Sequence, residues 1–238
     1  MQQAYFITGT DTDAGKTSVA AGLLYAAQQR QLSTLAMKPV ASGCEQTAQG
    51  LRNSDALALL AQSSVQLPYA QVNPYAFAPA IAPHIAAQEA GVELSVADLQ
   101  RAAQVVLQQQ ADFTLIEGAG GWRVPISNTA FLSDLAIALK LPVILVVGIK
   151  LGCINHALLT AQAIQSDGLE LAGWIANVID PNCARLEDNL ATLQQLMPAP
   201  CLAKVPYLPD PSAEHSAVYL QSCLAKLESG VILGKQTD

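Results

Sequence analysis

Short apolar runs alternate with amphipathic or alanine-rich stretches along the whole chain. Several of these runs are apolar on both faces, which is typical of parallel strands covered by helices on each side of a sheet. The pattern predicts strands over residues 4–8, 34–40, 113–117, 142–149, 171–178 and 201–205. It predicts helices over residues 15–31, 53–62, 95–110, 131–140, 155–166, 184–196 and 214–228, and Ser95 with Asp98 has the spacing of a capping box.

This alternation favours one α/β domain over residues 1–228, with a mostly parallel sheet flanked by helices on both faces. Residues 66–83 contain four prolines, and we expect them to form an ordered loop insertion. Residues 229–238 are polar enough to fray as a C-terminal tail. In such sheets ligands bind at the carboxyl ends of the strands, so motifs at those positions carry the functional weight.

Composition narrows the classes of partner and the compartment. A hydrophobic fraction of 51% supplies a core, and a formal net charge of −7 argues against a nucleic-acid partner. The most apolar run, 141–149, is too short to span a membrane, and the N-terminus lacks the pattern of a signal peptide. The five cysteines show no C-x-x-C spacing and are typical of free thiols in a reducing compartment, so we expect a cytoplasmic protein without a membrane partner.

The first predicted strand runs directly into GTDTDAGKT at residues 9–17, which a helical pattern follows. A strand, a glycine-containing loop and a helix start are the context of a P-loop, where backbone N–H groups and the helix dipole bind phosphates. Lys16 would reach the terminal phosphates and Thr17 would bind Mg²⁺. Asp11 and Asp13 make this loop unusually acidic, and they either face a cationic co-substrate or ion, or cap turns in solvent.

Three further positions lie at the ends of predicted strands or at the start of the next helix. Glu117 ends a strand before the glycine-rich turn 118–121, and in P-loop proteins an acid there completes the magnesium shell. Lys38 ends the second predicted strand, where its charge would face the same crevice and stabilise phosphoryl transfer. Asp55 opens the next helix, and beside these residues it becomes a candidate second magnesium ligand rather than a simple cap.

Taken together, these segments resemble the dethiobiotin synthetase family, in which an ATP-dependent enzyme closes the ureido ring during biotin synthesis. The resemblance rests on TGTDTDAGKT at 8–17, KPVASG at 38–43, LRNSDAL at 51–57, VNPYAF at 72–77, PHIAA at 83–87, EGAGGW at 117–122, PVILVVGIKLGCINHALLTAQAI at 142–164 and GWIAN at 173–177. The chain departs from the family pattern at Asp13, where many relatives carry Glu, and over 180–190, where the match is poor.

The resemblance implies a set of site residues. ATP would be bound by Asp13, Ala14, Gly15, Lys16, Thr17, Ser18, Asp55, Glu117, Gly118, Ala119 and Gly120, with Asn177, Val178, Pro206, Tyr207 and Leu208 around the adenine. Thr17, Asp55 and Glu117 would coordinate Mg²⁺, and Lys38 and Lys16 would be the catalytic lysines. Ser42 would contact the diamine substrate, while Gly152, Cys153 and Asn155 would receive its carboxylate across a homodimer interface.

The resemblance also implies the reaction: 7,8-diaminononanoate takes up CO₂ as a carbamate, ATP phosphorylates it, and the second amine closes the ring. Two other functions stay open from the residues. One is an amidase-type ligase of the same fold, although no Cys/His glutaminase segment is visible. The other is a partitioning-type ATPase switch, which the acidic balance and the lack of a basic amphipathic helix disfavour.

Overall fold

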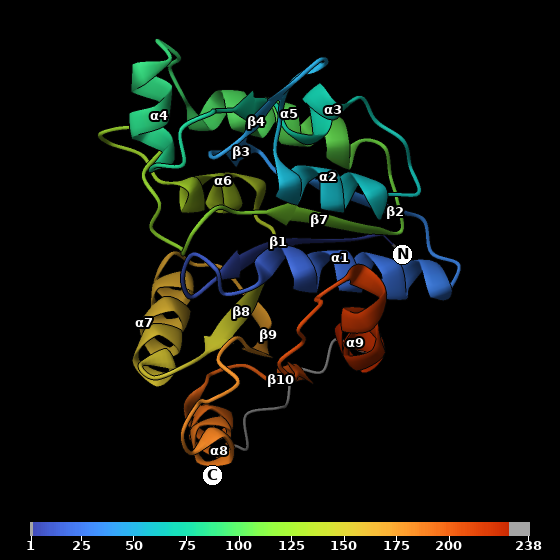
Figure 1. Cartoon of the computed structure of the whole chain (residues 1–238), viewed down its shortest axis with the longest axis vertical. Helices are drawn as coiled ribbons and strands as arrows, with labels where there is room; N and C mark the ends of the chain where they lie inside the picture. The colour runs from blue at the N-terminus through green and yellow to red at the C-terminus, as the bar shows by residue number, and fades with distance from the viewer. Residues whose placement is uncertain (1, 229–238) are drawn as a thin grey trace.

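The computed structural model describes residues 2–228, and a parallel sheet forms its centre (Figure 1). Within these residues six strands pair in the order β10-β9-β8-β1-β7-β2, and every pair is parallel. Their bounds are β1 Gln3–Gly9, β2 Thr34–Met37, β7 Phe113–Glu117, β8 Val143–Ile149, β9 Leu171–Val178 and β10 Cys201–Val205. The predicted α/β class with a parallel sheet is confirmed.

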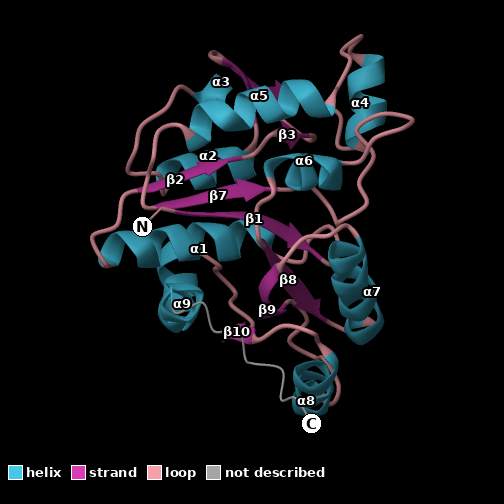
Figure 2. Cartoon of the chain, turned by 180° about the vertical axis from the view of Figure 1, so that it is seen from behind, coloured by secondary structure: helices cyan, strands magenta, loops and turns pink. Residues whose placement is uncertain are grey.

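Helices cover both faces of this sheet, as the two views in Figures 1 and 2 show. One face packs against α1 (Lys16–Gln29), α2 (Ser54–Ala61) and α9 (Ala213–Glu228). The other packs against α4 (Pro83–Glu89), α5 (Val96–Leu107), α6 (Leu132–Leu139), α7 (Cys153–Ser166) and α8 (Leu186–Leu196). In β1, Tyr5 and Ile7 join the first core and Phe6 joins the second, because successive side chains of a strand point to opposite faces.

Several smaller elements lie between β2 and α4 in the chain. Two-residue strands β3 (Val40–Ala41) and β6 (Tyr75–Ala76) pair in parallel, and β4 (Glu45–Thr47) and β5 (Gly50–Arg52) form an antiparallel hairpin. The short helix α3 (Tyr69–Val72) completes this region. Among residues 2–228, no helix combines the length and the apolar character needed to cross a membrane.

Every predicted strand and helix has a counterpart in the structure. Ser95 caps α5, because its hydroxyl accepts the Asp98 N–H, while the Asp98 carboxylate accepts from that same hydroxyl. The prediction of one strand over 34–40 is wrong, because β2 ends at Met37 and the N–H of Lys38 donates a hydrogen bond to the carbonyl of Val72. The prediction of an ordered loop over 66–83 is also wrong in part, because the short helix α3 and the short strand β6 lie within these residues. The predicted tail 229–238 lies outside the described residues.

Helices α1 and α9 pack closely at Gly22, which is in the middle of α1. A Cβ added at this glycine would come 2.8 Å from Leu220 Cδ1 and 2.8 Å from Ser216 Cβ, both on α9. We therefore expect Gly22→Ala to lower the free energy of unfolding by about 1–2 kcal/mol, because overpacking outweighs the better helix propensity of alanine. Urea denaturation measures this change. A stabilised variant would mean that α9 can shift away from the added methyl group without loss of packing.

Candidate active site

The loop between β1 and α1 takes a conformation that ordinary residues adopt at a cost. Asp13 has φ of 60° and Gly15 has φ of 83°, so two residues occupy the left-handed region just before the helix begins. A Cβ at position 15 would come 2.1 Å from Asn177 Nδ2, so no side chain fits there. Glycine therefore lets the loop pass directly beneath the side chain of Asn177, which in turn donates a 2.9 Å hydrogen bond to the Ala14 carbonyl.

Lys16 lies at the first position of α1 and is only 7% exposed. Its Nζ donates a 3.0 Å hydrogen bond to the carbonyl of Asp11, on the opposite side of the loop. Burial, and secondarily the charge of Lys38, lowers the pKa of Lys16 to about 8. An anion bound against this ammonium would stabilise its charged form, so the loop is electrostatically suited to phosphate.

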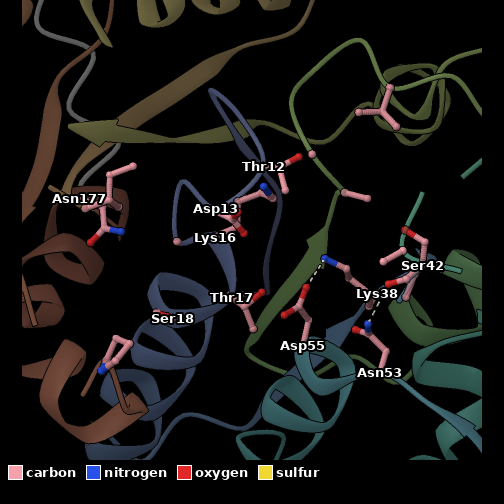
Figure 3. Close-up of a pocket in the computed structure, with 18 of the residues that line it drawn as sticks. Thr12, Asp13, Lys16, Thr17, Ser18, Lys38, Ser42, Asn53, Asp55 and Asn177 are labelled. Atoms are coloured by element: carbon pink, nitrogen blue, oxygen red, sulfur yellow. Dashed lines mark hydrogen bonds and ion pairs between the residues drawn. The ribbon is translucent and has the colours of Figure 1, made fainter. Parts of the chain in front are cut away.

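Lys38 lies between two carboxylates at the end of the sheet. Its Nζ is 3.0 Å from Asp55 Oδ2 (Figure 3). The same atom is 2.7 Å from Glu117 Oε1 and 3.1 Å from the Gly118 carbonyl oxygen. Burial alone would lower the pKa of Lys38, but the charges of Glu117 and Asp55 raise it above its usual value. Burial likewise opposes ionisation of Asp55, whose pKa the Lys38 charge nevertheless lowers. Lys38 and Asp55 therefore favour their charged forms.

Thr17, Asp55 and Glu117 together present oxygen atoms suited to a hard cation. The Thr17 hydroxyl donates to Glu117 Oε1 at 2.8 Å. The second oxygen, Glu117 Oε2, is buried and accepts no hydrogen bond from any residue in 2–228. Hydroxyl and carboxylate oxygens are ligands that Mg²⁺ prefers, with water and phosphate oxygens completing its shell. The same described residues hold no group of three or more His, Cys, Asp or Glu side chains suited to a metal.

A buried hydrogen-bond network holds the backbone around Lys38. Asn73 donates from Nδ2 to the Lys38 carbonyl at 2.7 Å and accepts at Oδ1 from the Tyr69 hydroxyl at 2.9 Å. That hydroxyl accepts the N–H of Asn53 at 2.7 Å. Asn53 caps α2 with its Oδ1 and donates from Nδ2 to the Ser42 carbonyl at 3.4 Å (Figure 3). These contacts fix Lys38, Ser42 and the first turn of α2 relative to one another.

A cleft of about 900 Å³ connects these groups. Its lining includes most of the predicted site residues: Asp13, Gly15, Lys16, Thr17, Ser18, Lys38, Ser42, Asp55, Ala119, Gly120, Asn177, Val178, Pro206, Tyr207 and Leu208. Figure 3 shows Lys16 and Thr17 between Asn177 on one side and Lys38 with Ser42 on the other. The volume of the cleft is therefore large enough for a nucleotide and a second small molecule.

The remaining predicted residues lie outside the lining of this cleft. Ala14 and Glu117 are fully buried, and Gly118 contributes the carbonyl that Lys38 contacts. Gly152, Cys153 and Asn155 lie at the start of α7; the Cys153 side chain is buried, whereas Gly152 and Asn155 are exposed. The predicted start of α7 at residue 155 is two residues late, because Gly152 with φ of 92° caps the helix.

The structure also resolves the role of Asp11, which the sequence left open. Its Oδ2 is 3.1 Å from Lys150 Nζ, and its Oδ1 accepts the N–H of Thr12 at 2.8 Å. The hydrogen bond from Lys150 is the main cause of the lowered pKa of Asp11. Asp11 therefore links the P-loop to the turn after β8, while Asp13 faces the cleft.

Several residues that line the cleft were not predicted from the sequence: Thr12, Asn53, Arg123, Ile179, Pro211, Ser216 and the segment 80–83. Arg123 follows the glycine-rich turn 118–121 and Trp122, and we expected that turn beside the P-loop. Its place in the sequence could therefore have marked it as a residue of the cleft. Its guanidinium donates hydrogen bonds to Asp167 at 2.7 Å and to Ser133 at 3.2 Å. These contacts hold the positive charge of Arg123 in the lining of the cleft. Asn53 lies within the LRNSDAL segment, two residues before Asp55, which was a further signal. Ser216 belongs to no quoted motif, and only its tertiary neighbours place it here.

Comparison with known proteins gives a family for most of the chain. A family model described as "AAA domain" matches residues 3–215. A protein of Pseudomonas aeruginosa strain UCBPP-PA14 named "ATP-dependent dethiobiotin synthetase BioD" is 65% identical over 217 residues, covering 91% of this chain and 95% of that protein. A protein of Cellvibrio japonicus with the same name is 59% identical over 219 residues, covering 92% and 96%.

Solved structures that resemble this one share its fold at low sequence identity. The MinC:MinD cell division complex of Aquifex aeolicus aligns with a TM-score of 0.63 and 12% identity, covering 99% of this chain and all of that one. MinD of Pyrococcus horikoshii with Mg-ADP aligns with a TM-score of 0.53 and 16% identity, covering 98% and 97%. At such identities the likeness establishes the P-loop fold alone.

Proposed function

The chain belongs to the ATP-dependent dethiobiotin synthetase family and is an ATP-dependent ligase that forms dethiobiotin; from this premise we propose how its residues perform the reaction. The observation that carries the proposal is the shared cleft, which places the P-loop beside the cluster of Lys38, Asp55 and Glu117. Phosphoryl transfer needs positioning and charge stabilisation above all, and this cleft supplies both.

The proposed reaction has three steps. One amine of 7,8-diaminononanoate attacks CO₂ and loses a proton, which gives a carbamate. A carbamate oxygen attacks the γ-phosphorus of ATP, and ADP leaves, so a carbamic-phosphoric anhydride forms. The second amine attacks the carbonyl carbon of this anhydride, the C–O bond to phosphate breaks, and ring closure releases inorganic phosphate that keeps the former carbamate oxygen.

Binding of ATP follows the length of the cleft. Lys16, Thr17 and Ser18 at the start of α1 bind the phosphates, with the loop amides from Asp13 to Gly15 around them. Asn177, Val178 and the segment Pro206, Tyr207 and Leu208 enclose the base at the other end. Gly120 and Ala119 border the γ-phosphate, where the small residues after β7 allow close approach.

Magnesium fits the oxygen atoms of Thr17, Asp55 and Glu117, and we propose that these residues hold it. The buried Glu117 Oε2, without a partner in residues 2–228, supports this assignment. The Mg-ADP bound to MinD of Pyrococcus horikoshii, a protein of the same fold, is consistent with it. When bound, the ion supplies positive charge beside the β- and γ-phosphate oxygens.

Lys38 supplies charge that the protein itself keeps in place. Its ammonium lies at the boundary between the phosphate loop and Ser42, so it stabilises negative charge on the carbamate and γ-phosphate together. The Asn73 contact to its carbonyl holds the backbone, which limits the reorganisation needed during transfer. Ser42, on the same side of the cleft, contacts the diamine.

The experiment for this order of steps follows oxygen. With C¹⁸O₂ supplied in a rapid single turnover, the mechanism places one labelled oxygen in the released inorganic phosphate and one in the ureido carbonyl of dethiobiotin. Mass spectrometry of both products measures the label. Unlabelled phosphate beside labelled dethiobiotin would mean that the carbamate oxygen never attacks phosphorus.

We further propose a homodimer in which Gly152, Cys153 and Asn155 bind the carboxylate of the diamine held in the partner's cleft. These residues lie outside the cleft of their own chain. Leu151 (94% exposed) directly precedes them, and Leu159 (57% exposed) lies four residues beyond Asn155 on α7. N–H groups at a helix start favour anions, and exposed apolar residues beside them are typical of an interface.

Mixed dimers test this sharing. Asn155→Asp should repel the carboxylate and raise the KM for the diamine, while Lys38→Ala should remove turnover. When equal amounts of the two variants are mixed and re-equilibrated, half of the dimers contain one subunit of each kind. In such a dimer the cleft that keeps Lys38 is served by the turn that keeps Asn155, so one of the two sites is intact. Activity should therefore return to about a quarter of the wild-type value. Steady-state rates at low diamine measure it. No recovery would mean that the turn serves its own subunit.

A further inference from the structure

Ser216 is a buried polar residue at the edge of the cleft that the proposed reaction leaves without a role. It lies in α9, is 1% exposed and contributes to the lining of the cleft. Its N–H donates to the Ser212 carbonyl at 3.0 Å, but its Oγ has no hydrogen-bond partner among residues 2–228. A buried hydroxyl without a partner destabilises the protein, and an alanine would fill the same space without this cost.

Ser216 reaches the cleft from α9, at a point where this helix packs against α1. The Ser216 Cβ lies 2.8 Å from where a side chain on Gly22 would begin, and Gly22 is one helical turn beyond Ser18 on α1. The segment that leads from β10 into α9 also lines the cleft, with Pro206, Tyr207, Leu208 and Pro211. Apolar, flat surfaces of this kind are suited to a planar ring, and the hydroxyl is the polar group that such a ring would meet.

We propose that the Ser216 hydroxyl forms a hydrogen bond with the nucleobase of ATP and so contributes to base recognition; this inference rests on the proposed placement of the nucleotide. A purine edge offers both ring-nitrogen acceptors and amino donors, and a hydroxyl can pair with either kind. In the nucleotide-bound protein the base satisfies a group that the free protein leaves unsatisfied. The hydroxyl therefore costs stability before binding and contributes affinity after it.

Calorimetric titration of Ser216→Ala with ADP tests the inference. We expect the Kd for ADP to rise about 3- to 10-fold, which is the usual effect of one neutral hydrogen bond. Binding of inorganic tripolyphosphate, which has no base, should be unchanged. Ser222→Ala, at an exposed serine on the same helix, is the matched control and should bind both probes like the wild type.

Thermal unfolding without nucleotide provides an independent readout. Ser216→Ala should unfold at the same temperature as the wild type or at a higher one, because no hydrogen bond is lost; a marked decrease would show a structural role instead. Ser216→Ala should raise the Kd for 2′-deoxy-ADP by the same factor as the Kd for ADP. If the variant and the wild type bind 2′-deoxy-ADP equally well, the Ser216 hydroxyl contacts the ribose instead of the base.

An unchanged Kd for ADP, or an equal rise for ADP and tripolyphosphate, would overturn base recognition by Ser216. The proposed nucleotide placement has its own check in the wild type, where tripolyphosphate should compete with ADP. If it does not compete, the placement of the phosphates is wrong and the inference is wrong with it. Competition in the wild type with no effect of Ser216→Ala rejects the inference alone.

Discussion

Replacing Lys38 with alanine should lower kcat about 10²–10³-fold, as expected when one charge-stabilising donor is removed from a site of phosphoryl transfer. The Lys38 ammonium lies 2.7 Å from Glu117 and 3.0 Å from Asp55, on the boundary between the P-loop and Ser42. The affinity for ATP should change far less, because in the proposed site Lys16 and the loop amides would bind the phosphates without Lys38. Single-turnover rates with saturating ATP and diamine, together with nucleotide titration, separate the two effects.

The same substitution removes the partner of a buried carboxylate, so stability must be measured beside activity. Breaking a buried ion pair typically costs about 3–5 kcal/mol, and a poorly folded variant would lose turnover for that reason alone. Turnover is therefore expressed per nucleotide-binding site, counted by titration. Near-normal turnover per site would assign Lys38 to a purely structural ion pair.

Glu117→Gln should lower kcat about 10²–10³-fold at ordinary magnesium concentrations and shift the magnesium dependence to higher concentration. The side chain is fully buried, its Oε1 accepts from Lys38 and Thr17, and its Oε2 accepts nothing from residues 2–228. Glutamine keeps the shape but removes the charge and replaces one oxygen by an amide, so a magnesium ion held as we propose would lose a ligand worth several kcal/mol.

Magnesium titration of the steady-state rate measures this shift, with Glu89→Gln at the exposed end of α4 as the matched control. Raising the magnesium concentration should restore part of the lost rate in Glu117→Gln and none in Lys38→Ala. A Glu117→Gln enzyme with an unchanged magnesium dependence would exclude Glu117 from the metal site.

The regular part of the fold could be predicted from hydrophobic periodicity. Strands such as Phe113–Glu117, Leu171–Val178 and Cys201–Val205 match their predicted bounds, because buried parallel strands are continuous apolar runs. The prediction failed beyond Met37, where Lys38 bonds to the Val72 carbonyl and Asn73 binds the Lys38 carbonyl. The partners of that segment come from more than 30 residues away, so no local pattern shows them.

The candidate site divides in the same way. Lys16, Thr17 and Gly15 belong to a short motif whose spacing is itself the chemistry, and the structure places all three in the cleft. Ser216 has no such motif, and α9 brings it to the cleft through its packing against Gly22 on α1. Polar residues that tertiary packing brings to a site cannot be told from ordinary helix residues in one sequence.

The central claim is that this cleft couples ATP cleavage to a carbamate of the diamine, and ADP release tests it most directly. Water is a poor substitute for the positioned nucleophile, so the protein with Mg²⁺ and ATP alone should release ADP slowly. Adding 7,8-diaminononanoate and bicarbonate together should raise the rate strongly, and omitting either should return it to background. ADP release that ignores the diamine but rises with DNA or membranes, or that requires glutamine or ammonia, would contradict this account.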